Sequence, residues 1–147
     1  EHGPQGGDEL NKIDRGNNYG WPTASLGTRY GGRSYKKNHS KNNFAEPIFS
    51  FLPSIAPSAL TSCPINLKNY YSGYTCLMGL TLREMSLMIY LIDETKNKLV
   101  SYEKIIIDKR IRHFGLNKNG TLHLNKENFY ISSDKDGLYK IKFKDFR

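Results

Sequence analysis

Three pairs of short hydrophobic segments, each joined by a polar turn, constrain the fold of this chain more than any other feature. The pairs are residues 86–93 and 98–108 around the turn 94–97, residues 112–116 and 121–124 around Asn119-Gly120, and residues 129–132 and 138–143 around Asp136-Gly137. Asn-Gly and Asp-Gly dipeptides between such segments favour tight hairpin turns. The chain is therefore expected to be an all-β protein built of antiparallel meanders.

The rest of the chain contains short strand signals and loops. Residues 1–35 are rich in Gly, Asn and Tyr and predict an ordered loop with one short strand, and residues 36–43 predict a polar surface excursion. From Glu46 onward strand-forming residues are interrupted by prolines, which exclude a helix. Residues 74–80 form a further apolar run. No helix longer than about two turns is expected.

Short strands at this spacing fit two all-β architectures, a sandwich and a propeller. A propeller blade takes roughly 40–50 residues, so a chain of 147 residues would hold about three blades. Three blades do not close a ring, and unclosed blades expose strand edges and core. If the architecture is a propeller, we expect the chain to be part of a larger domain.

The net charge of +8 raises the question of an anionic partner. The cations occur along the whole chain and no nucleic-acid-binding motif accompanies them, so most are interpreted as a solvated surface and no nucleic-acid partner is expected. A basic cleft for an acidic small molecule is the alternative. The longest apolar stretches are far too short for a bilayer-spanning helix, so no membrane span is expected.

Cys63 and Cys76 are the two cysteines, and they match neither a disulfide framework nor a CxxC metal site. One disulfide bridge would be compatible with an exported protein. We favour two buried free thiols, because free cysteine is among the most buried residue types.

The first 22 residues carry the densest chemical signal. They contain the segments Glu1-His2-Gly3-Pro4-Gln5-Gly6-Gly7-Asp8-Glu9-Leu10-Asn11 and Asn17-Asn18-Tyr19-Gly20-Trp21-Pro22. Carbonyls freed by Gly-Pro turns and carboxylate oxygens are the ligands that a hard cation such as calcium selects. The pattern therefore indicates a cation-binding turn, and a solvated acidic turn is the alternative.

These segments resemble the HGP-x-GGDE-(L/I)-N and NYGWP signature of the glucose/sorbosone dehydrogenase family, whose members are soluble PQQ-dependent aldose sugar dehydrogenases built on a six-bladed propeller. The resemblance continues in register and thins after residue 113. Pro53–Leu60 is similar to PSIAPSG-(L/M), with Ala59 in place of Gly, and Gly79–Arg83, followed by Ser86-Leu87, is similar to GAL-(K/R). Arg110-Ile111-Arg112 is similar to RIRDV, with His113-Phe114 in place of Asp-Val. Asn117–Leu122 is loosely similar to GPDGALY. The resemblance implies that residues 1–147 are the C-terminal part of a propeller domain, about three blades of the six.

The resemblance also implies roles for individual residues. The carbonyls of Gly3 and Pro4 would hold the calcium that binds the cofactor. Glu9 and Tyr19, the latter through its carbonyl, would belong to a further, structural calcium site. Tyr30 would line the cofactor pocket. The segments that would contact PQQ are Thr81-Leu82-Arg83 and Arg110-Ile111-Arg112.

The chemistry of the arginines agrees with that implication. PQQ is a planar quinone with three carboxylates, so guanidinium groups, aromatic faces and a divalent cation suit it. Arg110 and Arg112 are two residues apart on a predicted strand and therefore point to the same face, and Arg83 would join them from a neighbouring blade. Arg83 stands where many relatives have Lys, which would change the geometry at the cofactor.

The remaining candidate residues have weaker signals. His2 lies within the signature, whereas His39, His113 and His123 have no base or ligand partner at a diagnostic spacing. We interpret those three as surface or packing residues, and Trp21 as a core anchor.

The function that the resemblance implies is oxidation of an aldose sugar, with hydride transfer to PQQ at a calcium centre and with an electron acceptor as the second partner. The catalytic His of the family lies upstream of the signature, so no catalytic residue is assigned and this chain alone is expected to be inactive. A periplasmic or secreted location is implied. The alternative function is a non-catalytic extracellular calcium-binding propeller module for protein or carbohydrate ligands.

Overall fold

The computed structural model describes residues 1–124 and 128–142, which fold almost entirely into strands and loops. The elements in chain order are β1 (Asp8–Leu10), η1 (Ser40–Asn42), β2 (Phe49–Phe51), β3 (Pro57–Ser62), α1 (Ile65–Tyr70), β4 (Thr75–Thr81), β5 (Ser86–Asp93), β6 (Lys98–Ile106), β7 (Ile111–Phe114), β8 (Asn128–Ser133) and β9 (Leu138–Lys142). Strands were expected at 1–35, after Glu46 and at 74–80, and β1, β2 and β4 confirm them. Within these ranges the helices are short, as expected, and none has the length and apolar character needed to cross a bilayer.

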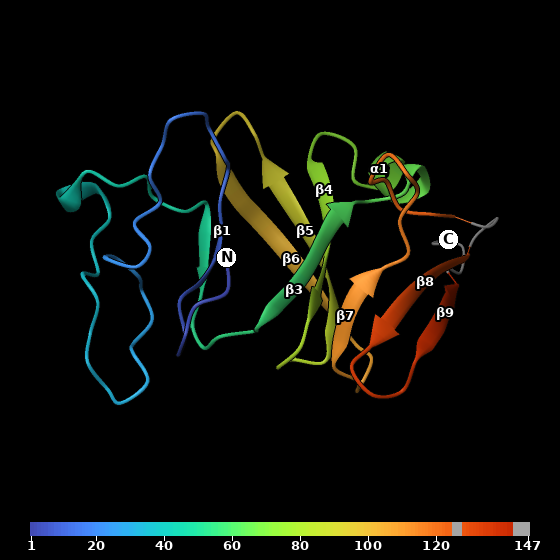
Figure 1. Cartoon of the computed structure of the whole chain (residues 1–147). Coiled ribbons are helices and arrows are strands. Elements are labelled where there is room, and N and C mark those ends of the chain that lie inside the picture. Colours follow the sequence, from blue (N-terminus) through green and yellow to red (C-terminus); the bar gives the residue numbers. More distant parts are fainter. Residues whose placement is uncertain (125–127, 143–147) are drawn as a thin grey trace.

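The strands form three antiparallel sheets. β3, β4, β5 and β6 make a four-stranded sheet in sequential order, β7, β8 and β9 make a three-stranded one, and β1 pairs with β2. The four-stranded sheet lies between the other two (Figure 1), and its first strand contacts the first strand of the next sheet, β7. Consecutive meanders packed in this way are the arrangement of propeller blades.

β5 is buried on both faces, and its alternate residues enter two separate cores. One face joins the core next to β7–β9, and the other joins the core next to β1 and β2. The residues of the first face are Leu87, Ile89 and Leu91. The residues of the second face are Met88, Tyr90 and Ile92. Since side chains alternate across a strand, the unbroken apolar run in the sequence fits a strand that is covered on both sides.

Gly79 allows β4 to lie against the ring of Tyr90 on β5. A Cβ at position 79 would lie 2.6 Å from Tyr90 Cε2, well inside the carbon–carbon contact distance of about 3.5–4.0 Å. Tyr90 is itself buried, and this burial raises the pKa of its phenol. Position 79 therefore requires glycine for packing.

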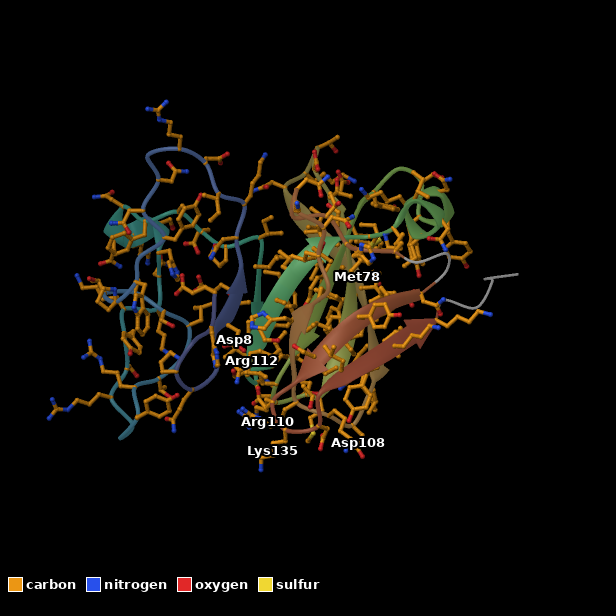
Figure 2. All side chains as sticks on the ribbon, turned by 45° about the vertical axis from the view of Figure 1, so that its right-hand side comes forward. Asp8, Met78, Asp108, Arg110, Arg112 and Lys135 are labelled. Atoms are coloured by element: carbon orange, nitrogen blue, oxygen red, sulfur yellow. A yellow bond between two sulfur atoms is a disulfide. The ribbon has the colours of Figure 1, made fainter. Side chains whose placement is uncertain are left out.

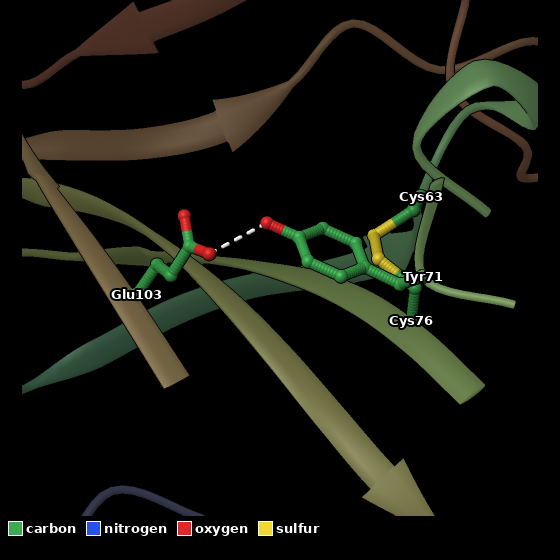
Figure 3. The surroundings of a disulfide bond; sticks show 4 residues. All are labelled: Cys63, Tyr71, Cys76 and Glu103. Atoms are coloured by element: carbon green, nitrogen blue, oxygen red, sulfur yellow. Dashed lines mark hydrogen bonds between the residues drawn. A yellow bond between two sulfur atoms is a disulfide. The ribbon is translucent and has the colours of Figure 1, made fainter. Parts of the chain in front are cut away.

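Cys63 and Cys76 form a disulfide (Figure 3), so the prediction of two free thiols is wrong. The pairing of β3 with β4 continues past the end of β3, where the Cys63 amide donates to the Cys76 carbonyl at 3.0 Å. This pairing places the two Cα atoms 5.4 Å apart, which is within the range that a disulfide requires. Both residues are buried, as expected.

Tyr71 connects the end of α1 to the outer strand β6. Its hydroxyl donates a hydrogen bond of 2.6 Å to Glu103 Oε1 (Figure 3). Burial and then the neighbouring Glu103 carboxylate raise the pKa of Tyr71 to about 12. The disulfide and this hydrogen bond therefore attach α1 to the four-stranded sheet at two points.

Two of the three predicted hairpins are confirmed. β5 pairs with β6 across the turn at residues 94–97, and β8 pairs with β9 across Asp136-Gly137. The predicted segment 138–143 ends in Phe143, which lies outside the described residues.

The hairpin predicted around Asn119-Gly120 is confirmed only next to its turn. Leu116 bridges to Leu122, and Asn117 N donates to Thr121 O at 2.7 Å while His123 N donates to Gly115 O at 2.9 Å. β7 itself pairs with β8 and not with residues 121–124. β8 contributes Phe129 to the core, where its side chain is completely buried. Pairing β7 with the strand that buries the larger apolar surface is the more stable arrangement.

Candidate functional site

The turn from Gly3 to Gly7 is shaped by close contacts between backbone segments. A Cβ at Gly7 would lie 2.1 Å from Gly27 N, and a Cβ at Gly3 would lie 2.4 Å from Gly6 O. Gly7 also has a φ of 66°, a conformation that favours glycine. These positions therefore exclude any side chain, and the turn keeps its carbonyls in a fixed arrangement.

Asp8 joins this turn to a distant segment of the chain. Its carboxylate is completely buried, and Oδ1 accepts a hydrogen bond from Gly3 N at 2.7 Å. Oδ2 accepts hydrogen bonds from Ser54 Oγ at 2.5 Å, from Ile55 N at 2.7 Å and from Ala56 N at 2.7 Å. Asp8 is not among the residues to which the family resemblance gives a role, although its place in the GGDE segment was the available signal.

The segment held by Asp8 in turn holds the loop that follows β4. Leu82 N donates to Ala56 O at 2.8 Å, and Arg83 N donates to Ile55 O at 3.2 Å. Leu82 is buried, whereas the side chain of Arg83 is exposed. Of these two residues, Arg83 therefore has the side chain available to a ligand.

Thr81 faces inward, and its hydroxyl is already engaged. Thr81 Oγ1 accepts a hydrogen bond from Ser86 N at 3.1 Å and lies 2.9 Å from Ser86 Oγ. Both residues are completely buried. The side chain of Thr81 thus closes the turn between β4 and β5, and a contact from Thr81 to a ligand would have to come from its backbone.

The start of β7 is attached to the same region through β3. Ser58 Oγ donates to Ile111 O at 2.6 Å, and Ile111 is completely buried. In the view of Figure 2, Asp8, Arg112 and Arg110 project near one another in the lower middle of the molecule. The structure therefore brings residues 3–8, 54–58, 81–83 and 110–112 together through hydrogen bonds, although they are far apart in sequence.

Arg110 and Arg112 lie on one face and share a single carboxylate. Arg112 donates to Asp134 from Nε at 2.7 Å and from Nη2 at 3.0 Å, and Arg110 Nε donates at 3.1 Å. The Arg112 and then the Arg110 guanidinium hold the pKa of Asp134 below its usual range. Two cations against one anion leave this group with a net positive charge that suits an anionic ligand.

Glu9, Asn11 and Tyr19 provide a second group of oxygen atoms around one cavity. The carboxylate of Glu9 is buried, which raises its pKa above the usual value, and Oε2 accepts a hydrogen bond of 3.3 Å from Asn11 Nδ2. Asn11 Oδ1 is buried and has no hydrogen-bond partner among residues 1–124 and 128–142. A cavity of about 250 Å³ is lined by residues that include Glu9, Asn11 and Tyr19. The hydroxyl of Tyr19 is engaged with Asp14 N and Lys12 O, so its carbonyl is the oxygen that Tyr19 could offer there.

His39 is completely buried between two carboxylates, which the sequence spacing did not reveal. Its Nε2 lies 3.4 Å from Glu9 Oε1, and its Nδ1 lies 3.7 Å from Glu46 Oε2. The interpretation of His39 as a packing residue is confirmed by its burial. Neither ring nitrogen has a hydrogen-bond partner among residues 1–124 and 128–142, so the two carboxylates are neighbours at ion-pair distance. His113 is exposed, and His123 Nδ1 lies 2.6 Å from Asn117 Oδ1.

Tyr30 and Trp21 lie outside the hydrogen-bonded group described above. Tyr30 is 76% exposed, on a loop between β1 and β2. Trp21 is 50% exposed, so its interpretation as a core anchor is wrong. Its ring packs against Tyr35, because the loop lies outside both hydrophobic cores.

The described part of the chain holds no group of three or more His, Cys, Asp or Glu side chains that could bind a metal ion. A cation bound by these residues would therefore need backbone and amide oxygens. Within the same part of the chain, no hydrogen bond ends on the carbonyl of Gly3 or Pro4. Hard cations such as calcium accept such ligands.

Comparison with known proteins identifies one family. A family model described as glucose/sorbosone dehydrogenase matches residues 1–134. The uncharacterized protein slr1608 of Synechocystis sp. is 30% identical over 125 residues, which cover 84% of this chain and 30% of that protein. The aldose sugar dehydrogenase YliI of Escherichia coli strain K12 is 41% identical over 64 residues, which cover 41% of this chain and 17% of that protein.

Solved structures share the fold over nearly the whole chain. A structure titled as a crystal structure of glucose dehydrogenase superposes with a TM-score of 0.74 at 24% identity, covering 99% of this chain and 40% of that one. The apo form of the soluble aldose sugar dehydrogenase from Escherichia coli superposes with a TM-score of 0.71 at 24% identity, covering 97% and 39%. The propeller alternative predicted from the sequence is thereby confirmed over the sandwich. The chain spans well under half the length of the relatives it matches.

Proposed function

The chain belongs to the glucose/sorbosone dehydrogenase family, and from this premise we propose that the complete protein is an oxidoreductase that oxidises an aldose or a similar sugar. We further propose that residues 1–147 form the C-terminal part of its propeller domain. The coverage of about 40% of a neighbouring structure supports this division. The catalytic base would then lie in a part of the protein outside this sequence, and we assign no catalytic residue here.

The proposed cofactor is PQQ, held with calcium at the edge where residues 3–8, 81–83 and 110–112 meet. The single observation that carries this proposal is the chain of hydrogen bonds through Asp8 and Ser58 that joins those segments. In this proposal the guanidinium groups of Arg83, Arg110 and Arg112 bind the cofactor carboxylates. Tyr30 lines the pocket, and Thr81, Leu82 and Ile111 contribute through their backbone and their packing.

The carbonyls of Gly3 and Pro4 fit a calcium ion beside that cofactor. No residue of the described ranges donates a hydrogen bond to either oxygen, and the close backbone contacts at Gly3 and Gly7 hold the turn in one arrangement. When bound, PQQ with calcium would supply a hydride acceptor whose carbonyl is polarised by the metal. The part of this chain is to fix the orientation of that group and to neutralise its charge.

A second calcium ion fits the cavity beside Glu9. The buried carboxylate of Glu9, the unpaired Oδ1 of Asn11 and the carbonyl of Tyr19 are oxygen ligands of the kind that calcium selects. We propose a structural role for this ion, because no residue of the segments 81–83 and 110–112 lines the cavity.

The Cys63–Cys76 disulfide supports a location outside the reducing cytosol, either periplasmic or secreted. Disulfides of this kind form and persist in oxidising compartments and are rare in the cytosol. The position of the bridge between β3 and β4 makes it a structural element of the blade.

The proposal is tested on the full-length protein, reconstituted with PQQ and calcium and screened against sugars with an artificial electron-accepting dye. We expect calcium-dependent PQQ binding by calorimetry and sugar-dependent reduction of the dye. Arg112→Gln should weaken PQQ binding at least tenfold, consistent with the loss of a charged bidentate contact. Lys98→Gln, which removes an equal charge on the outer strand β6, is the matched control and should bind normally.

Two outcomes would overturn the proposal. Absence of both PQQ binding and sugar oxidation, with calcium binding retained, would instead favour a non-catalytic calcium-binding module. Equal losses in Arg112→Gln and Lys98→Gln would show that the arginine face is not the binding site.

A further inference from the structure

The net charge of the protein is concentrated in one segment. Residues 15–45, here called the basic loop, contain six basic residues and no acidic residue, so they carry six of the eight net charges of the chain. The basic residues are Arg15, Arg29, Arg33, Lys36, Lys37 and Lys41. The loop extends away from the sheets on the side of β1 and β2 (Figure 1). The charge is therefore a local feature of one surface.

The cations of the basic loop are exposed and carry no counter-charge. None of the six forms an ion pair with another of the residues 1–124 or 128–142. Lys37 is tied to the loop itself, because its ammonium donates to the carbonyls of Leu26 and Gly27. Elsewhere Lys104, Lys109 and Arg112 each face a carboxylate. The basic loop therefore offers an anionic partner six cations that have no carboxylate partner within the described ranges.

Aromatic side chains lie among these cations. The guanidinium carbon of Arg29 lies 4.6 Å from the centroid of the Tyr35 ring, and the centroid of Tyr35 lies 5.5 Å from that of Trp21. Trp21 and Tyr30 are exposed. Tryptophan, tyrosine and arginine are the residues that most often dominate binding energy at protein interfaces. This composition favours a protein partner over a simple counter-ion atmosphere.

The tip of the basic loop is preorganised. Arg29 N donates to Arg33 O at 2.8 Å, and Gly32 N donates to Arg29 O at 2.9 Å. A bridge between Thr28 and Ser34 closes the same turn. The backbone that carries Tyr30 and its neighbouring cations is therefore held in one arrangement, which lowers the entropy cost of binding.

The base of the same turn rests on the proposed calcium turn. Thr28 N donates to Gln5 O at 3.0 Å, and the backbones of Gly7 and Gly27 are in close contact. Gln5 follows Gly3 and Pro4, whose carbonyls are the proposed calcium ligands. The basic loop therefore lies next to the proposed cofactor edge.

We propose that the basic loop is the docking surface for an acidic protein that accepts the electrons of the reaction, an inference that rests on the proposed function. Oxidation of a sugar hydroxyl to a carbonyl releases two electrons and two protons. The protons leave to solvent, and two molecules of a one-electron acceptor protein each take one electron. Positive charge on the loop accelerates the encounter with an acidic acceptor by electrostatic steering.

The test uses the full-length protein loaded with PQQ and calcium, and a sugar that supports dye reduction. The probes are an acidic and a basic c-type cytochrome of similar size and a small uncharged dye. The variant Arg33→Glu/Lys36→Glu reverses two loop charges, and Lys98→Glu/Lys118→Glu makes the same change in charge outside the loop. At low salt we expect the loop variant to reduce the acidic cytochrome about tenfold more slowly, with an unchanged rate for the dye.

Three results would overturn the inference. The first is that the wild-type protein reduces the acidic and the basic cytochrome at equal rates. The second is that the control variant loses as much of its rate with the acidic cytochrome as the loop variant does. The third is that the loop variant loses binding to anionic lipid vesicles while its rate with the acidic cytochrome is unchanged. The last result would assign the surface to a membrane instead. Absence of sugar-dependent dye reduction would contradict the proposed function. In that case, titration of the protein with the oxidised acidic cytochrome would still decide whether the basic loop binds this cytochrome.

Discussion

The sheet region from β3 to β9 and the loop region before it are stabilised in different ways. In the sheet region two apolar cores lie on either side of β5, and cations such as Lys104 and Lys109 face carboxylates. In the loop region, glycine contacts and the buried carboxylate of Asp8 hold the backbone. The cations of the basic loop form no ion pair with any residue that the structure describes. The comparison teaches that apolar packing builds the scaffold, while buried polar contacts hold the parts that we assign to ligands.

Asp8→Ala tests whether one carboxylate holds the loop region, and it has the largest expected effect. The change leaves the buried donors Gly3 N, Ile55 N and Ala56 N without their acceptor, and each unsatisfied group costs about 1–3 kcal/mol. We expect the free energy of unfolding of the complete protein to fall by at least about 3 kcal/mol in urea titrations. The exposed control Asp14→Ala should change it by less than about 0.5 kcal/mol. Similar values for the two variants would contradict the role of Asp8.

Removing the disulfide tests how far the sheet region depends on a covalent link. Cys63→Ala/Cys76→Ala should lower the free energy of unfolding by about 2–3 kcal/mol, because the bridge closes a short loop in the unfolded chain. Dithiothreitol should bring the wild-type protein to the stability of the variant and leave the variant unchanged. Detection of two free thiols in the untreated protein would show that the bridge is absent.

Gly79→Ala tests the packing of the sheet region itself. The added methyl group would press on the buried ring of Tyr90, and overpacking of this kind costs about 1–3 kcal/mol. Gly115→Ala is the matched control, since a Cβ there would lie 3.4 Å from its nearest neighbour. Thermal unfolding of both variants provides the measurement. Adding Tyr90→Leu to Gly79→Ala should restore part of the lost thermal stability, because the smaller side chain leaves room for the methyl group.

The smallest expected effect concerns the exposed turn between β5 and β6. The hydroxyl of Thr95, followed by Lys96, lowers the pKa of Asp93 to about 2, and Asp93 Oδ1 accepts hydrogen bonds from both backbone amides. Because the folded pKa lies below the unfolded value of about 3.9, the stabilisation is complete above that value and is lost as the pH falls toward about 2. The urea midpoint of Asp93→Asn should therefore lie below that of the wild type at pH 5 and approach it at pH 2. A constant difference would contradict this assignment.

The sequence predicted the sheet region well where one local pattern decides the outcome. The polar turn at residues 94–97 and Asp136-Gly137 gave correct hairpins, because the turn and the flanking apolar residues favour the same pairing. The turn at Asn119-Gly120 gave only a short hairpin next to the turn, since β7 itself pairs with β8, whose Phe129 is buried in the core.

The candidate site was predicted less completely from the sequence. The family signature indicated Gly3, Pro4 and Glu9, but it gave no sign that Asp8 links the signature to residues 54–56. The environment of His39 was missed for the same reason, because Glu9 and Glu46 reach it only after the loop has folded.

By itself, the sequence determined the all-β class, two of the three hairpins and the family, because turn chemistry, side-chain alternation and signature residues are local properties of the chain. The tertiary structure decided the pairing of Cys63 with Cys76, the partner of β7, the exposure of Trp21 and the role of Asp8. Each of these depends on which distant segment comes within a few ångströms, and that is set by the burial of apolar surface and the satisfaction of buried polar groups across the whole fold.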